Sequence, residues 1–185
     1  MGFKALPADS IAMLDASHRR QEQRLDECLD AVQALTDGRA GQDQVATIAR
    51  VLEFLRKQAA RHVEDEEESV FPRLAARPDF SELLVALESE HREHETMIAE
   101  LEDLFEAWAD AVPPSRAVSV FASRFAEFSA HYRAHIARED DELVPAMRRE
   151  LTANELADIS SEMISRRPKS SRWSRVGRGR KRRSL

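Results

Sequence analysis

The most restrictive feature of this sequence is an internal repeat with an offset of 73 residues. The segments HVEDEEESVFP and HIAREDDELVP are two versions of one motif, and a histidine further upstream repeats at the same offset. The matched pairs are His18 and His91, His62 and His135, Glu66 and Glu139, and Pro72 and Pro145. Chance similarity between Glu-rich and Ala-rich helices does not explain why the rarer residues coincide. The repeat therefore predicts two copies of one supersecondary unit.

Each copy has the hydrophobic periodicity of a helical hairpin. Glycine is scarce, and Ala, Leu, Glu and Arg dominate, as is typical of helical proteins. We expect helices over about 10–35, 42–72, 81–108, 115–143 and 153–164. Pro72 should bend or end the second helix, and Thr152 and Glu155 have the spacing of a capping box that starts the fifth. The predicted fold class is all-α, an antiparallel up-down four-helix bundle of two similar helical hairpins with a short C-terminal helix and a disordered tail.

The repeated histidines should lie at one level of this bundle. Residues equally far from the turn of an antiparallel hairpin lie at the same height, because every helix rises about 1.5 Å per residue. Residue 40 in the first turn and Pro113 in the last lie midway between the histidines of their hairpins. Each glutamate follows its histidine by one helical turn on the same face. The six residues expected in one layer are His18, His62, Glu66, His91, His135 and Glu139.

Imidazole and carboxylate groups that converge in a helical core favour a metal site. Any single histidine is more often an ordinary core residue, but four at one level reverse that preference. Two inward glutamates suit two metal ions, because each carboxylate can bridge both, and this ligand chemistry suits iron, manganese or zinc. A bundle that only mediates protein interactions would leave all six residues without a role.

The pattern resembles the hemerythrin or HHE cation-binding family, whose helices carry His, His-x-x-x-Glu, His and His-x-x-x-Glu in that order. The resemblance covers residues 10 to about 148. It implies a non-haem di-iron centre, in which the six residues hold two iron ions with carboxylate bridges and an oxo or hydroxo bridge. It also implies a small-molecule ligand: dioxygen, hydrogen peroxide or nitric oxide.

The sequence departs from the oxygen-carrying hemerythrins on two helices. Those proteins have His-x-x-x-His on the third helix, where this chain has Glu95, and His-x-x-x-x-Asp on the fourth, where it offers both Glu139 and Asp140. Glu139 lies about 40° around the helix from His135 and Asp140 about 140°, so Glu139 is the expected ligand and Asp140 should face solvent. Without a fifth histidine both ions keep positions for added ligands, which favours peroxide turnover over reversible oxygen storage.

The preferred functional hypothesis is therefore an oxidoreductase of oxidative defence. It would process hydrogen peroxide, as catalase-like members of the family do, with nitric oxide as a second candidate substrate. The alternative is a protein that binds, stores or senses dioxygen, nitric oxide or iron without turnover. The same six ligands serve both hypotheses.

Five neighbouring residues could modify the site. Glu22 and Glu95 each lie one helical turn from a predicted ligand and could ligate, accept a hydrogen bond from an imidazole or face solvent; we favour the last two roles. Tyr132 could act as a ligand or proton donor, but core packing is the favoured role. His94 and His131 have no histidine counterpart in the repeat and rank below the main four.

The last twenty residues differ from the rest of the chain. Residues 166–185 carry ten Lys or Arg and no acidic residue, whereas the whole chain has a net charge of -6. We expect one domain over 1–165 and a disordered basic tail over 166–185, which either binds nucleic acid or another anionic surface or only aids solubility. The single Cys28 and the absence of an apolar N-terminal run predict a cytoplasmic protein that does not enter a membrane.

Overall fold

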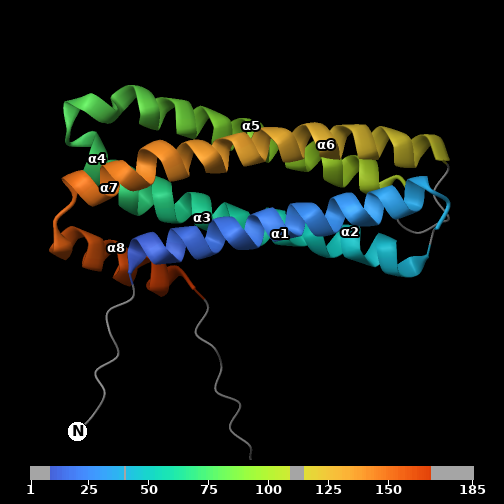
Figure 1. Cartoon of the computed structure of the whole chain (residues 1–185), viewed down its shortest axis with the longest axis horizontal. Helices are drawn as coiled ribbons and strands as arrows, with labels where there is room; N and C mark the ends of the chain where they lie inside the picture. Colours follow the sequence, from blue (N-terminus) through green and yellow to red (C-terminus); the bar gives the residue numbers. More distant parts are fainter. Residues whose placement is uncertain (1–8, 40, 109–114, 168–185) are drawn as a thin grey trace, which may run out of the picture.

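The computed structural model describes residues 9–39, 41–108 and 115–167, and these form four antiparallel helical rods with a fifth helix beside the start of the first rod (Figure 1). The first rod is α1 (Ser10–Thr36), and the third is α5 (Ser81–Glu106), preceded by the 3₁₀ turn η3 (Pro78–Phe80). The second rod contains α2 (Gln42–Phe54), η1 (Leu55–Ala59), α3 (Ala60–Asp65), η2 (Glu66–Val70) and α4 (Phe71–Ala75). The fourth contains α6 (Ser115–Arg138), η4 (Glu139–Leu143) and α7 (Val144–Glu150), and α8 (Ala153–Arg166) follows it. The predicted all-α four-helix bundle is confirmed.

Local side-chain chemistry fixes the ends of the first and last helices. The carboxylate of Asp9 accepts a hydrogen bond of 3.0 Å from the backbone N–H of Ile11, which caps α1. Gly38 has a φ of 73°, a left-handed conformation that turns the chain after this helix. The predicted capping box of α8 is confirmed, because the Thr152 hydroxyl accepts from the N–H of Glu155 and the Glu155 carboxylate accepts from the N–H of Thr152.

The second and fourth rods widen into π-turns where the repeated glutamates begin. In η2 the N–H of Phe71 bonds to the carbonyl of Glu66, five residues earlier. In η4 the N–H of Val144 bonds to the carbonyl of Glu139 in the same way. The repeated prolines directly follow these donors, and a proline ring clashes with the carbonyl four residues before it, which an extra residue in the turn relieves. The helix therefore continues through Pro72 instead of ending there, and the fourth rod likewise runs past the predicted end near residue 143 to Glu150.

Two apolar clusters fill the bundle on either side of a polar layer. One cluster joins the C-terminal half of α1 to α2, α5 and α6 and contains the fully buried Phe121, Phe125 and Phe128. The other joins the start of α1 to α4, α7 and α8 and contains the buried Leu74 and Ile159. The predicted layer of histidines and glutamates lies between these two clusters along the bundle axis. Because both clusters consist of buried apolar side chains, they separate the layer from bulk water along the bundle axis.

The C-terminal helix packs through Ile159 and Met163, which are fully buried, while Ile164 is 51% exposed. The helix extends through Arg166, one residue into the segment predicted to be a tail, and the guanidinium groups of Arg166 and Arg167 both bind the buried carboxylate of Asp65. The rest of the predicted basic tail, with its suggested binding to nucleic acid or anionic surfaces, lies outside the described residues. Among the described residues, no helix has an apolar stretch long enough to cross a membrane.

Candidate metal centre

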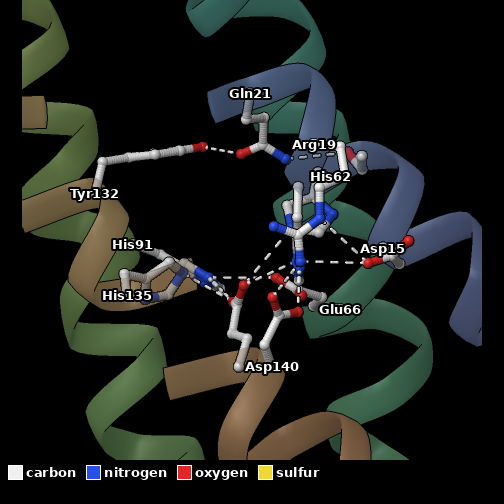
Figure 2. Close-up of polar contacts among 12 residues, drawn as sticks. Asp15, Arg19, Gln21, His62, Glu66, His91, Tyr132, His135 and Asp140 are labelled. Atoms are coloured by element: carbon white, nitrogen blue, oxygen red, sulfur yellow. Dashed lines mark hydrogen bonds and ion pairs between the residues drawn. The ribbon is translucent and has the colours of Figure 1, made fainter. Parts of the chain in front are cut away.

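The structure brings all six sequence-predicted ligands into one buried cluster (Figure 2). The residues come from every rod of the bundle: His18 from α1, His62 and Glu66 from the second rod, His91 from α5, and His135 and Glu139 from the fourth rod. Each is at most 6% exposed. His18, His62, Glu66 and Glu139 offer donor atoms within 4.8 Å of one another, and so do His91, His135 and Glu139. These His and Glu groups could hold a metal ion.

Glu139 contacts the histidines of both hairpins. Its Oε2 atom lies 3.1 Å from Nε2 of His18 and 3.8 Å from Nε2 of His62. Its Oε1 atom lies 2.8 Å from Nε2 of His135 and 3.6 Å from Nε2 of His91. One oxygen of this carboxylate therefore faces each histidine pair.

Glu66 divides its oxygens in the same manner. Its Oε1 atom lies 3.5 Å from Nε2 of His62, on the first hairpin. Its Oε2 atom lies 3.4 Å from Nε2 of His91, on the second. Both repeated glutamates thus span the two histidine pairs, and Figure 2 shows His91 and His135 on one side of the carboxylates and His62 on the other.

The contacts inside this cluster fit metal ligands better than they fit hydrogen bonds. All four carboxylate oxygens of Glu66 and Glu139 are buried and lack a hydrogen-bond partner among the described residues, as does Nε2 of His91. The Nε2 atoms of His18 and His62 are only 3.1 Å apart. Donors that bind one transition metal at about 2.1 Å with right angles between them lie about 3 Å apart. A metal would also satisfy carboxylates that are costly to bury alone, so the residues fit such a group.

A carboxylate binds the outward nitrogen of three of the four histidines. These hydrogen bonds join Nδ1 of His18 to Asp140 at 2.8 Å, Nδ1 of His91 to Glu67 at 2.8 Å, and Nδ1 of His135 to Glu90 at 2.7 Å. Each acceptor places the ring proton on Nδ1 and leaves the Nε2 lone pair directed into the cluster. Guanidinium groups hold two of the acceptors, because Arg19 binds Asp140 and Arg138 binds Glu90.

These three acceptors are not among the residues predicted from the sequence. Asp140 was expected to face solvent, and that prediction was wrong, since its carboxylate bonds to both His18 and Arg19. The angle around the helix between Asp140 and His135 was the wrong criterion, because the Asp140 side chain reaches residues of the neighbouring helix α1. The repeat contained a usable signal: Glu67 and Asp140 are counterparts at the offset of 73, and so are the histidines that they bind.

The other candidate residues lie around the cluster and outside it. Glu22 accepts a hydrogen bond from Arg19, and Glu95 is exposed. Tyr132 is buried and its hydroxyl donates to the side-chain oxygen of Gln21, a contact that Figure 2 shows above the cluster. This bond directs the phenol away from the converging carboxylates.

The two lower-ranked histidines have different surroundings. His131 is exposed. His94 is buried, with its ring centroid 5.0 Å from that of His135 and 4.8 Å from that of Tyr132. Burial and the neighbouring His135 and His91 lower the pKa of His94 to about 3, so this imidazole is neutral at ordinary pH.

A cavity of about 430 Å³ leads to one face of the cluster. It lies between the second rod and α5, and its lining includes His62, His91, His94 and His135. Apolar side chains such as Val63 and Ile98 form much of its remaining wall, and exposed Glu95 and Ala99 also line it. A small molecule can therefore approach the histidines without disrupting the bundle.

The carboxylates dominate the electrostatics of the metal-free cluster. Burial alone would lower the pKa of His18, yet its contacts with Glu139, Glu66 and Asp140 outweigh burial and raise the pKa to about 9. The same balance, with Glu139, Glu66 and Glu67, raises the pKa of His91 to about 10. Burial would raise the pKa of Glu139, but its four histidine contacts hold that pKa well below the usual value. Protonated histidines therefore balance the buried carboxylates when no metal is bound.

These shifts predict how the stability of the metal-free protein depends on pH. Since folding raises the pKa of His18 and His91 from 6.5 to about 9 and 10, their contribution is complete below about pH 6.5 and is lost as the pH rises through 9 to 10. Urea unfolding of the metal-free protein should therefore show a falling free energy of unfolding from pH 6.5 to 10. The double variant His18→Gln, His91→Gln should show a smaller decline. A wild-type free energy that is constant over this range would contradict the assigned charge balance.

Comparison with known proteins agrees with this geometry. A search of curated proteins finds no match. The family model described as the hemerythrin HHE cation binding domain matches residues 9–147, which is most of the chain and includes all six clustered residues. The chain therefore belongs to the hemerythrin HHE cation-binding family.

Proposed function

We propose that the six clustered residues hold two iron ions. His18 and His62 would bind one ion, His91 and His135 the other, and both glutamates would bridge them. The observation that supports this proposal is the division of each carboxylate, with one oxygen near each histidine pair. A single metal ion would leave one pair of buried imidazoles without a ligand role.

The chemistry of the donors supports iron. Neutral imidazoles and carboxylates together suit transition-metal ions of intermediate hardness. Among these ions, membership of the hemerythrin family favours iron. The single cysteine, Cys28, is buried in the apolar cluster and not among the polar donors, so a thiolate would not contribute. Two bridging carboxylates also supply part of the negative charge that offsets a pair of divalent or trivalent ions.

The residues around the ligands would orient them and exclude water. Asp140, Glu67 and Glu90 fix three imidazole rings through Nδ1 and increase the basicity of Nε2. The ring of Phe71 stacks on His91 with a centroid distance of 5.9 Å, which restricts rotation of that imidazole. Most of the cluster is thereby enclosed, and the cavity beside α5 remains the route for a ligand.

We further propose that the protein converts hydrogen peroxide to dioxygen and water. A pair of iron ions would supply the two-electron redox chemistry that this disproportionation needs. The described side chains provide four imidazoles and two carboxylates for two ions, which leaves positions for added ligands on both. His94 lines the cavity as a neutral imidazole and can exchange hydrogen bonds with a peroxide that enters. Reversible binding of dioxygen or nitric oxide is the competing outcome.

A matched pair of glutamate variants tests the metal ligands. Glu139→Gln removes a bridging charge at the centre of the cluster and should lower iron content more than tenfold, because an amide ligates poorly. Glu95→Gln changes the same side chain at an exposed position on the cavity wall and should keep about two irons per chain. Metal analysis of the purified proteins measures both. Equal iron content in the two variants would show that the cluster is not the iron site.

A second pair of variants tests the peroxide reaction and its access route. The iron-loaded protein should evolve dioxygen from hydrogen peroxide, measured with an oxygen electrode. Ala99→Phe fills the cavity mouth and should reduce kcat/KM several-fold, whereas Ala130→Phe, at an exposed position on α6 outside the cavity lining, should not. If the iron-loaded protein leaves peroxide unchanged and binds dioxygen or nitric oxide reversibly, the catalytic proposal is wrong and the binding function replaces it.

A further inference from the structure

The two hairpins differ at one position that supplies a hydrogen-bond acceptor to a clustered histidine. Nδ1 of His135 bonds to Glu90, but Nδ1 of its repeat counterpart His62 is buried and has no hydrogen-bond partner among the described residues. The repeat explains the difference, because the counterpart of Glu90 is Ser17, whose side chain is too short and carries no charge. His62 is therefore the one clustered histidine without a carboxylate behind it in the described structure.

A small cavity of about 60 Å³ lies beside Ser17 and His62, the residues that correspond to Glu90 and His135 in the other hairpin. The hydroxyl of Ser17 already accepts a hydrogen bond of 3.0 Å from Gln21, so its own proton is free to be donated. Two residues that line the cavity therefore carry a donor without an acceptor among the described residues, and the His62 side chain is only 5% exposed.

The charge around this cavity is positive. Arg20, Arg61 and Arg167 line it together with the carboxylate of Asp65. Asp65 is 1% exposed and already binds two guanidinium groups, Arg166 at 3.1 Å and Arg167 at 3.0 Å. Arg20 and Arg61 form no ion pair within the described ranges, and Arg61 contacts only the amide oxygen of Gln58. Two arginines are therefore available to an anion.

We propose that this cavity binds a small oxyanion of the carboxylate type, such as bicarbonate or formate. The anion would accept the N–H of His62 Nδ1 and the hydroxyl of Ser17, and it would lie against the guanidinium groups of Arg20 and Arg61. A volume of about 60 Å³ corresponds to about two water molecules, which fits an ion of three or four heavy atoms. In this position the anion would accept a hydrogen bond from Nδ1 of His62, as Glu90 does from Nδ1 of His135.

The anion site has a consequence for the metal centre, and that consequence alone depends on the proposed function. Loss of a carboxylate partner behind a ligand histidine weakens metal binding about 10- to 100-fold. The ion held by His18 and His62 should therefore bind more weakly than its neighbour until the anion enters. The concentration of bicarbonate or formate would then control whether one or both metal positions are filled.

Calorimetric titration of the full-length, metal-free protein tests the anion site directly. Sodium formate and sodium bicarbonate are titrated separately, with sodium chloride at equal ionic strength as the reference. We expect saturable binding of at least one oxyanion and none of chloride, and the relative affinities show which oxyanion the cavity prefers. Absence of saturable binding by either oxyanion would overturn the proposal.

Three variants locate the binding. Ser17→Glu supplies the carboxylate of the other hairpin and should abolish anion binding, and Arg61→Gln should weaken it about tenfold. Arg50→Gln removes an exposed arginine of α2 that does not line the cavity and should leave the affinity unchanged. If formate binds Ser17→Glu and Arg61→Gln as tightly as the wild type, the anion lies elsewhere and the inference is wrong.

A second measurement separates this inference from the proposed function. In the iron-loaded wild type, the bound oxyanion should slow removal of the more labile iron by a chelator at least tenfold, and Ser17→Glu should make that removal slow without added anion. Failure to load iron, together with anion binding that the variants abolish, would contradict only the di-iron proposal. Two irons per chain without any anion binding would contradict only the anion site.

Discussion

Burying two carboxylates at the centre of a helical bundle imposes the constraint that organises this protein. Glu66 and Glu139 are fully buried, and their oxygens lack hydrogen-bond donors with suitable geometry among the described residues. Such charges are strongly unfavourable unless cations neutralise them. Protonated imidazoles supply part of that charge in the metal-free protein, as the raised pKa values of His18 and His91 indicate. A pair of metal ions would replace those protons and satisfy every oxygen at once.

The surrounding structure positions this charged layer and keeps it enclosed. The π-turns that begin at the two glutamates recur at the offset of the repeat, and so do the prolines that follow them. One apolar cluster lies on each side of the layer, and α8 completes the second of these through Ile159 and Met163. The duplicated hairpins therefore build a nearly symmetric site. Its symmetry is broken where Ser17 replaces a glutamate, and the proposed anion cavity lies at that position.

The sequence predicted the bundle and the six clustered residues because both depend on regular geometry. Helical rise and the two turns set the level of the histidines, and the repeat distinguished Glu139 from Asp140. Features that depend on contacts between neighbouring helices were not predictable in this way. The repeat pairs Asp140 with Glu67, but only the packing of the fourth rod beside α1 shows that Asp140 accepts from His18. The acceptor role of Glu90 has no counterpart in the repeat to reveal it. The exposed position of Ile164 likewise depends on how α8 packs beside α1 and the second rod.

The proposed centre requires that two metal ions share the carboxylates of Glu66 and Glu139. Crystals of the iron-loaded protein, with anomalous diffraction recorded on both sides of the iron absorption edge, test it most directly. We expect two iron peaks about 3 to 4 Å apart, one beside His18 and His62 and the other beside His91 and His135, with both glutamates between them. A single peak, or two peaks that do not share a glutamate, would contradict it.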